Sequence, residues 1–294
     1  MSRRATAPLL SVLIPAYRYP EGIARILGRL GAYDPDLVEI LISDDSPDQT
    51  VETVVRRAGI AGVGYHRNSP PLGAPENWNA LLGKASGEFC LMLHHDEFPL
   101  TDDFLKQILR QLAELRMCDV FLLDCVLVDP CAGRSRRHLP FGLRMAAVRH
   151  APSYLLRRNV VGPVSVIIVR RILYPTFDPK LKWLVDVDVY LRLFAGLPKI
   201  AACPHIMVGS ILGRKDSITA QLGAGRTKVA AEERRYLRTK HRGLAFWYNN
   251  SPGHHLLRAG EWACWVFFRG VTRALWVLFP PVARKTAVWA TLRC

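Results

Sequence analysis

The chain has 294 residues, half of them hydrophobic, which is enough apolar surface for a sizeable core and excludes an intrinsically disordered protein. The chain has 40 Lys and Arg residues and 25 Asp and Glu residues. The resulting net charge of +15 favours an anionic partner such as nucleotide phosphates, nucleic acid or acidic lipid. The seven cysteines are odd in number and include no CxxC pair, which indicates a reducing cytosol rather than a disulfide framework.

The N-terminal stretch does not have the pattern of a signal peptide. It carries two arginines, but only about seven apolar residues precede Pro15 and no small-residue cleavage site follows. We therefore expect a protein that is not exported.

From the start to about residue 130, short apolar runs alternate with helix-like segments. The runs SVLIP, EILIS and FCLML are continuously apolar, which is typical of parallel strands covered on both faces. Between and after them we predict helices over 21–30, 49–58, 76–85 and 102–115. This alternation predicts an α/β fold with a Rossmann-like, mostly parallel sheet and helices on both faces.

The second half is less regular. Residues 131–160 are basic and weakly patterned, and we expect a mobile connection or one that faces an acceptor. PVSVIIVRR then predicts a strand, VDVDVYLRLFAG a helix ended by Gly196, and KIAACPHIMVGSIL a final strand. We place one domain over 1–225 and a helical C-terminal extension over 226–294.

The extension differs from the rest in composition. It holds 13 Lys and Arg against 3 Glu, and five of the seven tryptophans. Its longest apolar run, ALWVLFPPVA, is far shorter than the roughly 20 residues that a membrane-spanning helix needs. Two interpretations stay open: a basic, Trp-rich helix lying in the headgroup plane of a membrane, which we favour slightly, and a helical pair packed on the main domain.

Polar residues follow three of the predicted strands, over 15–17, 44–46 and 94–97. Ligands of open α/β sheets bind outside the carboxyl ends of the strands, so three such clusters on one edge of the sheet predict a ligand-binding site there. Of Asp44 and Asp45, we expect one to turn the chain and the other to face the site, although SDDSPDQT also fits a simple turn.

The cluster HHDE, residues 94–97, offers two imidazoles and two carboxylates. If the strand is still extended, His94 and Asp96 face one side, and His95 and Glu97 the other. A carboxylate with a neighbouring imidazole could hold Mg²⁺ or Mn²⁺ together with substrate phosphates, whereas no HExxH or cysteine spacing supports zinc. The alternative is a set of strand-end polar residues that meet solvent.

Four segments together resemble the family 2 glycosyltransferases of GT-A fold, over about residues 9 to 222. They are LLSVLIPAYRYPEGIARIL, VEILISDDSPDQT, NSPPLGAPENWNALLGKASGEFCLMLHHDE and FDPKLKWLVDVDVYLRL, in this order. The resemblance implies that the first-strand motif holds the base and ribose, and that the second carboxylate of SDDS accepts a hydrogen bond from N3 of uracil or thymine. The implied nucleotide-binding residues are Pro15, Ala16, Tyr17, Asp45, Arg67, Asn77, His94, His95, Arg214 and Lys215.

The resemblance also implies a metal site and a catalytic base. Residues 94–96 occupy the DxD motif, with His94 in place of the first aspartate as in a subset of the family, so Asp96 and His94 become the ligands of Mn²⁺ or Mg²⁺. Asp186 falls where the base sits, and Val185 replaces the acidic residue before it. The alternative for Asp186 and Asp188 is a pair of charges at a helix start.

We therefore predict an inverting glycosyltransferase that moves a hexosyl or deoxyhexosyl group from a nucleoside diphosphate sugar, preferably linked to UDP or dTDP. The acceptor would be a hydroxyl of a glycan or lipid-linked glycan in cell-surface polysaccharide synthesis. The expected location is the cytoplasm, with peripheral binding to the cytoplasmic face of the plasma membrane through the extension. Nucleic acid is not an expected partner, because the chain has no zinc finger, RNP-like motif or helix-turn-helix pattern. The competing hypothesis is a degenerate transferase that serves as a scaffold or binding subunit.

Overall fold

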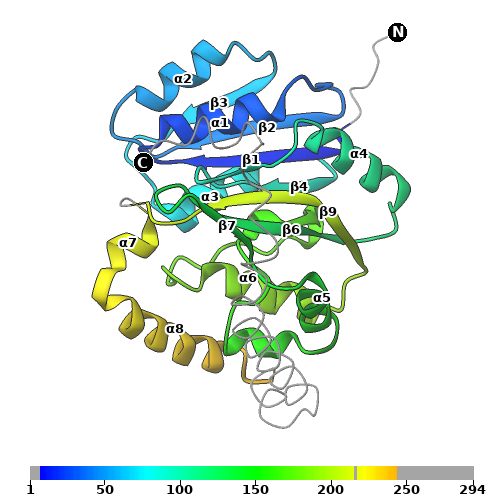
Figure 1. The fold of residues 1–294 in the computed structure, drawn as a ribbon, viewed down its shortest axis with the longest axis vertical. Helices are drawn as coiled ribbons and strands as arrows, with labels where there is room; N and C mark the ends of the chain where they lie inside the picture. The colour runs from blue at the N-terminus through cyan, green and yellow to red at the C-terminus, as the bar shows by residue number, and fades with distance from the viewer. Residues whose placement is uncertain (1–6, 215–216, 244–294) are drawn as a thin grey trace.

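The computed structural model describes residues 7–214 and 217–243. Within these ranges the chain forms a mixed α/β fold built on one nine-stranded sheet (Figure 1). The strand order is β3-β2-β1-β4-β8-β6-β9-β5, and β7 pairs with β6 beside this path. No helix in the described ranges is long and apolar enough to cross a membrane.

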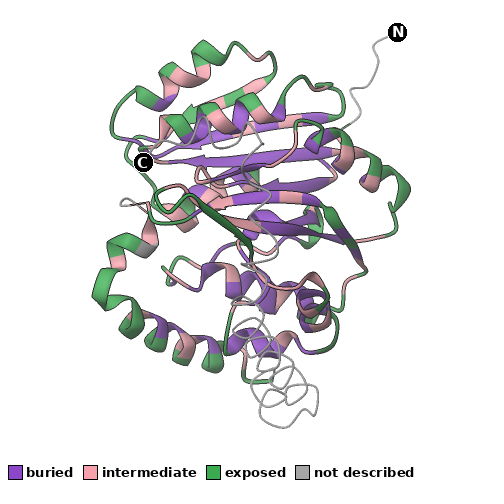
Figure 2. Ribbon diagram, in the orientation of Figure 1, coloured by how far each residue is buried: buried purple, intermediate pink, exposed green. Residues whose placement is uncertain are grey.

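The first half of the sheet is parallel. Its strands are β1 (Leu10–Ala16), β2 (Val38–Asp44), β3 (Val63–Arg67) and β4 (Phe89–Met92). Its helices are α1 (Pro20–Leu30), α2 (Thr50–Ala58) and α3 (Ala74–Lys84). Right-handed crossovers place α1 and α2 on one face, and α3 packs against β1 and β2 from the other. All seven residues of β1 are buried, because both faces of this central strand are covered (Figure 2).

Antiparallel pairs enter the sheet at β8, which runs against both β4 and β6. The strands of this half are β5 (Glu97–Pro99), β6 (Val120–Asp129), β7 (Arg134–Arg137), β8 (Ile167–Arg170) and β9 (Ile200–Ile211). The α-helices are α4 (Phe104–Glu114), α5 (Phe141–His150), α6 (Val185–Ala195), α7 (Ile218–Leu222) and α8 (Arg226–Lys240). Short 3₁₀ turns are η1 (Pro152–Leu156), η2 (Val164–Val166), η3 (Arg171–Leu173) and η4 (Gly223–Gly225).

The expected α/β class is confirmed, and the first four predicted helices appear with ends that differ by one or two residues. The segment PVSVIIVRR is only partly a strand, because its first residues form η2 and pairing with β4 starts near Ile168. The basic connection over 131–160 is more ordered than its sequence pattern suggested, since it contains β7, α5 and η1.

An internal ion pair explains how that basic connection folds. Arg144 of α5 is fully buried and donates to Asp124 Oδ1 at 2.8 Å, while its other nitrogens donate to the carbonyls of Leu123 and Val161. A buried charge is tolerated when it is paired and hydrogen-bonded, and these partners satisfy the guanidinium on three sides. The apolar pattern of α5 is therefore interrupted by a charge that points into the core.

Candidate active site

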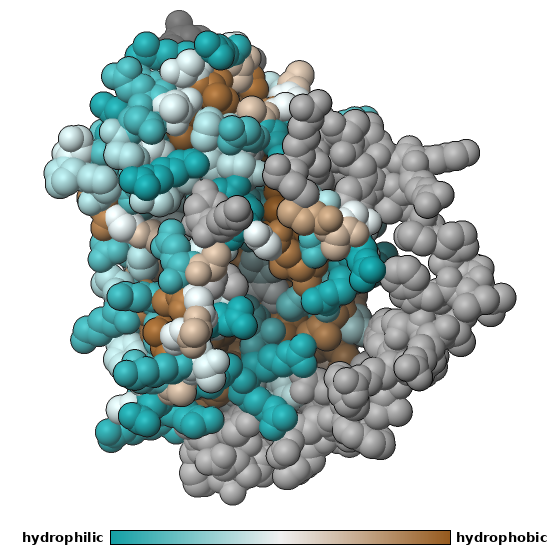
Figure 3. Space-filling model, turned by 60° about the vertical axis from the view of Figure 1, so that its left-hand side comes forward, coloured by the Kyte–Doolittle hydropathy of each residue, from teal (hydrophilic) through white to brown (hydrophobic). Residues whose placement is uncertain are grey.

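A pocket of about 630 Å³ opens at the carboxyl ends of the parallel strands. Figure 3 looks toward this side of the molecule, where hydrophobic and hydrophilic side chains meet around a hollow. The lining residues are Pro15, Ala16, Tyr17, Asp45, Pro71, Leu72, Gly73, Ala74, Asn77, Trp78, His94, His95, Asp96, Ser217, Ile218 and Gln221. Eight of the twelve residues predicted from the sequence therefore share one cavity, as the parallel strand ends require.

The adjacent carboxylates at the end of β2 have different surroundings. Asp44 turns the chain, since its Oδ1 accepts from Ser46 N at 2.8 Å and its Oδ2 from the Tyr65 hydroxyl at 2.8 Å. Asp45 lines the pocket instead. Burial, and after it the hydrogen bond to Asp44, raises the pKa of Tyr65 well above its usual value, so this tyrosine stays a donor.

Asp45 also holds one wall of the pocket in place. Its Oδ1 accepts from Asn68 Nδ2 at 2.7 Å and Leu72 N at 3.1 Å, and its Oδ2 accepts from Gly73 N at 2.9 Å. Asn77 joins this network, because its Oδ1 accepts from Asn68 at 3.1 Å. A carboxylate can accept roughly four hydrogen bonds, so one position on Oδ2 is left for a donor on a bound base.

Three predicted residues that the structure describes, Arg67, Asp186 and Arg214, lie outside the lining of the pocket. Arg67 ends β3 opposite Asp44, and the next residue, Asn68, supplies the contact with Asp45. Sequence reasoning missed Asn68, although an amide directly after a strand end was a usable signal.

The sequence HHDE forms a turn rather than an extended strand. β4 ends at Met92, and Glu97 N donates to His94 O at 2.9 Å. The alternation expected for an extended strand therefore does not apply: His94, His95 and Asp96 all line the pocket. In an extended strand Glu97 would face away from His94. In the turn the Glu97 side chain lies next to His94 instead, and its Oε2 accepts a hydrogen bond from His94 N at 3.1 Å.

His94, Asp96 and Glu97 form a group that fits a divalent cation. Their ligand atoms lie within 4.8 Å of one another, and His94 Nε2 is buried with no hydrogen-bond partner among the described residues. Burial lowers the pKa of His94 to about 4, so the imidazole is neutral at pH 7, the form that binds metals. Burial, reinforced by the charge of Asp96, raises the pKa of Glu97 well above its usual range, which a bound cation would offset.

Aromatic side chains fix the orientation of the His94 ring. Trp78 of α3 packs against it with ring centroids 4.5 Å apart, and Phe177 makes an edge-to-face contact with Trp78 at 5.0 Å. Phe177 is itself held by Asn79, whose amide makes paired hydrogen bonds with the Phe177 backbone at 2.9 and 2.7 Å. Trp78 was not among the predicted residues, because its packing depends on chain segments far apart in sequence.

Asp186 lies in the first turn of α6, in surroundings that favour its protonated form. Burial raises the pKa of Asp186 to about 7, against hydrogen bonds from Val187 N and Asn159 that lower it. Asn159 Nδ2 donates to Asp186 Oδ2 at 2.6 Å, and Asn159 Oδ1 is committed to the N–H groups of Val161 and Gly162. The carboxylate is therefore held in one orientation with a pKa suited to proton transfer near neutral pH.

The predicted phosphate clamp is described only in part. The Arg214 guanidinium lies over the Tyr19 ring, 3.1 Å from its centroid, and Ser217, Ile218 and Gln221 after it line the pocket. Lys215 lies outside the described residues, as do the five tryptophans of the C-terminal extension. Their predicted roles stay predictions.

The turn at His95 depends on a close approach by Gly22 in α1. A Cβ at this position would lie 2.1 Å from His95 O, so we expect Gly22→Ala to displace the turn, at a cost of about 1–3 kcal/mol. Binding of a nucleoside diphosphate with Mn²⁺ should weaken by roughly tenfold, measured by calorimetry.

Gly28→Ala in the same helix is the matched control. Gly28 is exposed, and a Cβ added there meets no described atom within 4 Å. It should leave binding unchanged and raise the free energy of unfolding by about 0.5–1 kcal/mol. Equal binding by both variants would show that the turn tolerates the displacement.

Comparison with known families now identifies the domain. Residues 11–168, more than half of the chain, match the sequence profile of Glycosyl transferase family 2. The chain belongs to this family. Membership makes it a glycosyltransferase, and the match covers β1 to β4 with the Asp45 and Asp96 clusters. No curated protein sequence matches this family 2 glycosyltransferase.

Solved structures share the fold of this family 2 glycosyltransferase. Staphylococcus aureus TarS 1-349 in complex with UDP-GlcNAc is 18% identical with a TM-score of 0.57, covering 72% of this chain and 60% of that one. The mannosyltransferase PcManGT from Pyrobaculum calidifontis, in complex with GDP-Man and Mn²⁺, is 16% identical with a TM-score of 0.56, covering 97% and 85%. The chain thus spans less than two thirds of the TarS chain, and at these identities the likeness establishes the GT-A fold.

Proposed function

We propose that this protein is an inverting, metal-assisted glycosyltransferase that transfers a sugar from a nucleoside diphosphate donor to an acceptor hydroxyl. The observation that carries this proposal is one cavity, in a family 2 domain, lined by both the Asp45 network and the turn with His94 and Asp96. The free acceptor position on Asp45 suits the N3–H of uracil or thymine, and the three ligand atoms of the turn suit Mn²⁺ or Mg²⁺ beside a diphosphate.

The proposed chemistry assigns a separate task to each group. Asp186 takes the proton of the acceptor hydroxyl, the hydroxyl oxygen forms a bond to the anomeric carbon, and the opposite bond to the diphosphate breaks with its electron pair on the leaving group. His94 and Asp96 would hold the cation, which neutralises charge on the departing diphosphate when bound. Tyr17 and Asp45 hold the base, and Arg214 with Lys215 would clamp the phosphates.

The acceptor and the location are further parts of the proposal. A glycan or lipid-linked glycan at the cytoplasmic face of the plasma membrane fits the basic composition of the C-terminal extension, which we propose follows the domain over 1–225 and begins at residue 226. Deleting residues 255–294 should then release the protein from anionic vesicles in a co-sedimentation assay. Unchanged vesicle binding by the shortened chain would contradict this role.

Thermal shift against UDP, dTDP, GDP and CMP, each with Mn²⁺, Mg²⁺ or EDTA, tests the donor class. A ligand at 100 times its Kd adds about 2.7 kcal/mol of stability, so we expect one nucleoside diphosphate to raise Tm clearly, and only with metal. UDP-GlcNAc and GDP-mannose, the donors bound to the two structural neighbours, extend the panel. If no nucleotide raises Tm under any condition, the scaffold hypothesis gains over the transferase.

A further inference from the structure

Helix α8 contacts the segment that carries Asp186 through a carboxylate. Glu233 is buried, and it accepts hydrogen bonds from three consecutive backbone N–H groups at the entry to α6. The distances are 2.7 Å from Lys182 N, 3.1 Å from Trp183 N and 2.8 Å from Leu184 N. Leu184 is the N-cap of α6 and has no polar atom in its side chain, and Glu233 holds the N–H groups of this residue and of the two before it, directly ahead of the first turn.

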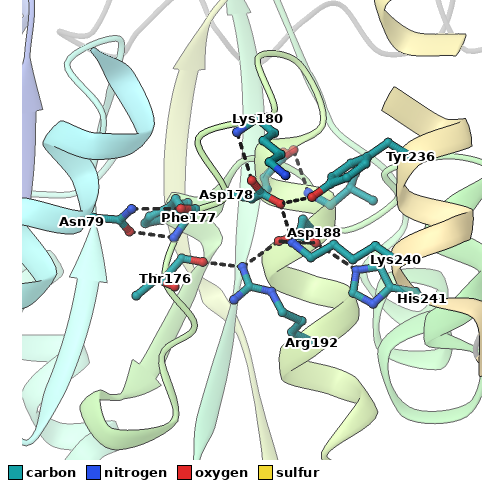
Figure 4. A network of polar contacts seen from close by, with 12 residues as sticks. Asn79, Thr176, Phe177, Asp178, Lys180, Asp188, Arg192, Tyr236, Lys240 and His241 are labelled. Atoms are coloured by element: carbon teal, nitrogen blue, oxygen red, sulfur yellow. Dashed lines mark hydrogen bonds and ion pairs between the residues drawn. The ribbon is translucent and has the colours of Figure 1, made fainter. Parts of the chain in front are cut away.

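A second set of contacts joins the end of α8 to Asp188, which follows Asp186 in α6, and to Asp178. Figure 4 shows Asp188 of α6 and the nearby Asp178 meeting side chains from the end of α8. Lys240 Nζ lies 2.9 Å from Asp188 Oδ1 and 2.6 Å from Asp178 Oδ2, and His241 Nε2 lies 2.8 Å from Asp188 Oδ1. The hydrogen bonds from His241 and Lys240 outweigh burial and lower the pKa of Asp188, so this carboxylate is charged at neutral pH.

These contacts come from one face of α8. Ala230, Glu233, Leu237 and Lys240 recur at intervals of three or four residues, which places them in one row. Ala230 and Leu237 in this row are buried, and Tyr236 beside the row donates to Asp178 Oδ2 at 2.8 Å. A helix this polar has little apolar surface to hold it, so its position is set by paired charges and hydrogen bonds.

We propose that Glu233 is a positioning residue for the catalytic base, and that α8 acts as a strut fixing the first turn of α6. This inference rests on the proposed function. Asp186 lies only two residues after Leu184, and its carboxylate accepts hydrogen bonds from Val187 N and Asn159 in the same region. The position of the proposed base therefore depends on the backbone of this turn. A shift of about 1 Å in a reacting group can cost roughly 10²-fold in rate.

The charged and titratable groups facing Asp186 come from three elements. Glu233 approaches from α8, Glu97 from β5 and Tyr190 from α6 itself. The negative charge of Glu233 adds to the effect of burial in raising the pKa of Asp186. Removing that charge should therefore lower this pKa, which gives a signal that a loss of stability alone does not produce.

Glu233→Gln tests the strut, with Glu232→Gln as the matched control, because Glu232 is exposed on the same helix and carries the same charge. The assay is hydrolysis of UDP-GlcNAc or GDP-mannose, whichever stabilises the wild type, with water as acceptor. We expect Glu233→Gln to lower kcat by roughly 10- to 100-fold, to leave the Kd of the donor within about twofold, and to move the acidic limb of kcat to lower pH. Glu233→Asp, which keeps the carboxylate, should recover part of kcat.

A folded Glu233→Gln with the kcat and pH profile of Glu232→Gln would overturn the proposal. If Glu233→Gln does not fold, Lys240→Met weakens the far end of the strut and should lower kcat with the same unchanged Kd. Hydrogen exchange on the wild type needs no substrate: amides 182–184 should be as protected as the middle of α6, and free exchange there would also overturn the proposal. Failure of the transferase function would instead appear as a wild type that binds no nucleotide.

Discussion

Replacing Asp186 by Asn is expected to lower the rate of sugar transfer by about 10²- to 10⁴-fold, the usual contribution of a positioned general base. The amide cannot take the acceptor proton, while the neighbouring contacts with Asn159 and Val187 keep its place in α6. Because Asp186 does not line the donor pocket among the described residues, the Kd for the nucleotide should stay within about twofold. Steady-state kinetics combined with calorimetry measures both.

The pH dependence supplies an independent check of the same residue. Burial raises the pKa of Asp186 to about 7, and a general base works in its deprotonated form. The wild-type kcat should therefore rise as pH increases through about 7 and then level off, and the remaining activity of Asp186→Asn should lack this step. A wild-type profile that is flat between pH 6 and about 8 would remove Asp186 from the role of base.

Asp96→Ala is expected to abolish the metal-dependent part of nucleotide binding and to lower kcat by at least about 10²-fold. Of the three candidate metal ligands at the turn, the variant keeps His94 and Glu97 and loses Asp96, the carboxylate that lines the pocket. Thermal shift with UDP or GDP should show a Tm increase with Mn²⁺ for the wild type and none for the variant.

Asp102→Ala is a suitable control for that experiment. Its carboxylate is 90% exposed and pairs only at the surface with Arg29, an interaction of about 0–1 kcal/mol. Its nucleotide binding should equal that of the wild type. Metal-dependent stabilisation of Asp96→Ala equal to that of Asp102→Ala would place the cation elsewhere.

Local sequence patterns were enough to predict much of the fold. Unbroken apolar runs such as FCLML are typical of strands covered on both faces, and β1, β2 and β4 are parallel strands of this kind. Because parallel strands end at the same edge, the sequence also predicted that Tyr17, Asp45 and Asp96 would line one site. The helix around Asp186 was predicted from its spacing and from Gly196 at its end.

The details of the site depend on contacts between distant parts of the chain. The strand alternation assumed for HHDE failed because β4 stops at Met92, and a turn then brings Glu97 back to His94. Asp45 takes its partners from residues 68–73, since a carboxylate at a strand end accepts from whichever N–H groups the fold brings near.

The sequence by itself determined the α/β layering and the edge on which the site lies, because both follow from side-chain periodicity along single segments. Only the tertiary structure decided the orientation of the groups in the site: Trp78 on His94, Asn159 on Asp186, and Glu233 on the N–H groups before α6. The physical reason is that hydrogen bonds and ring contacts act over a few ångströms in space, whatever the distance along the chain.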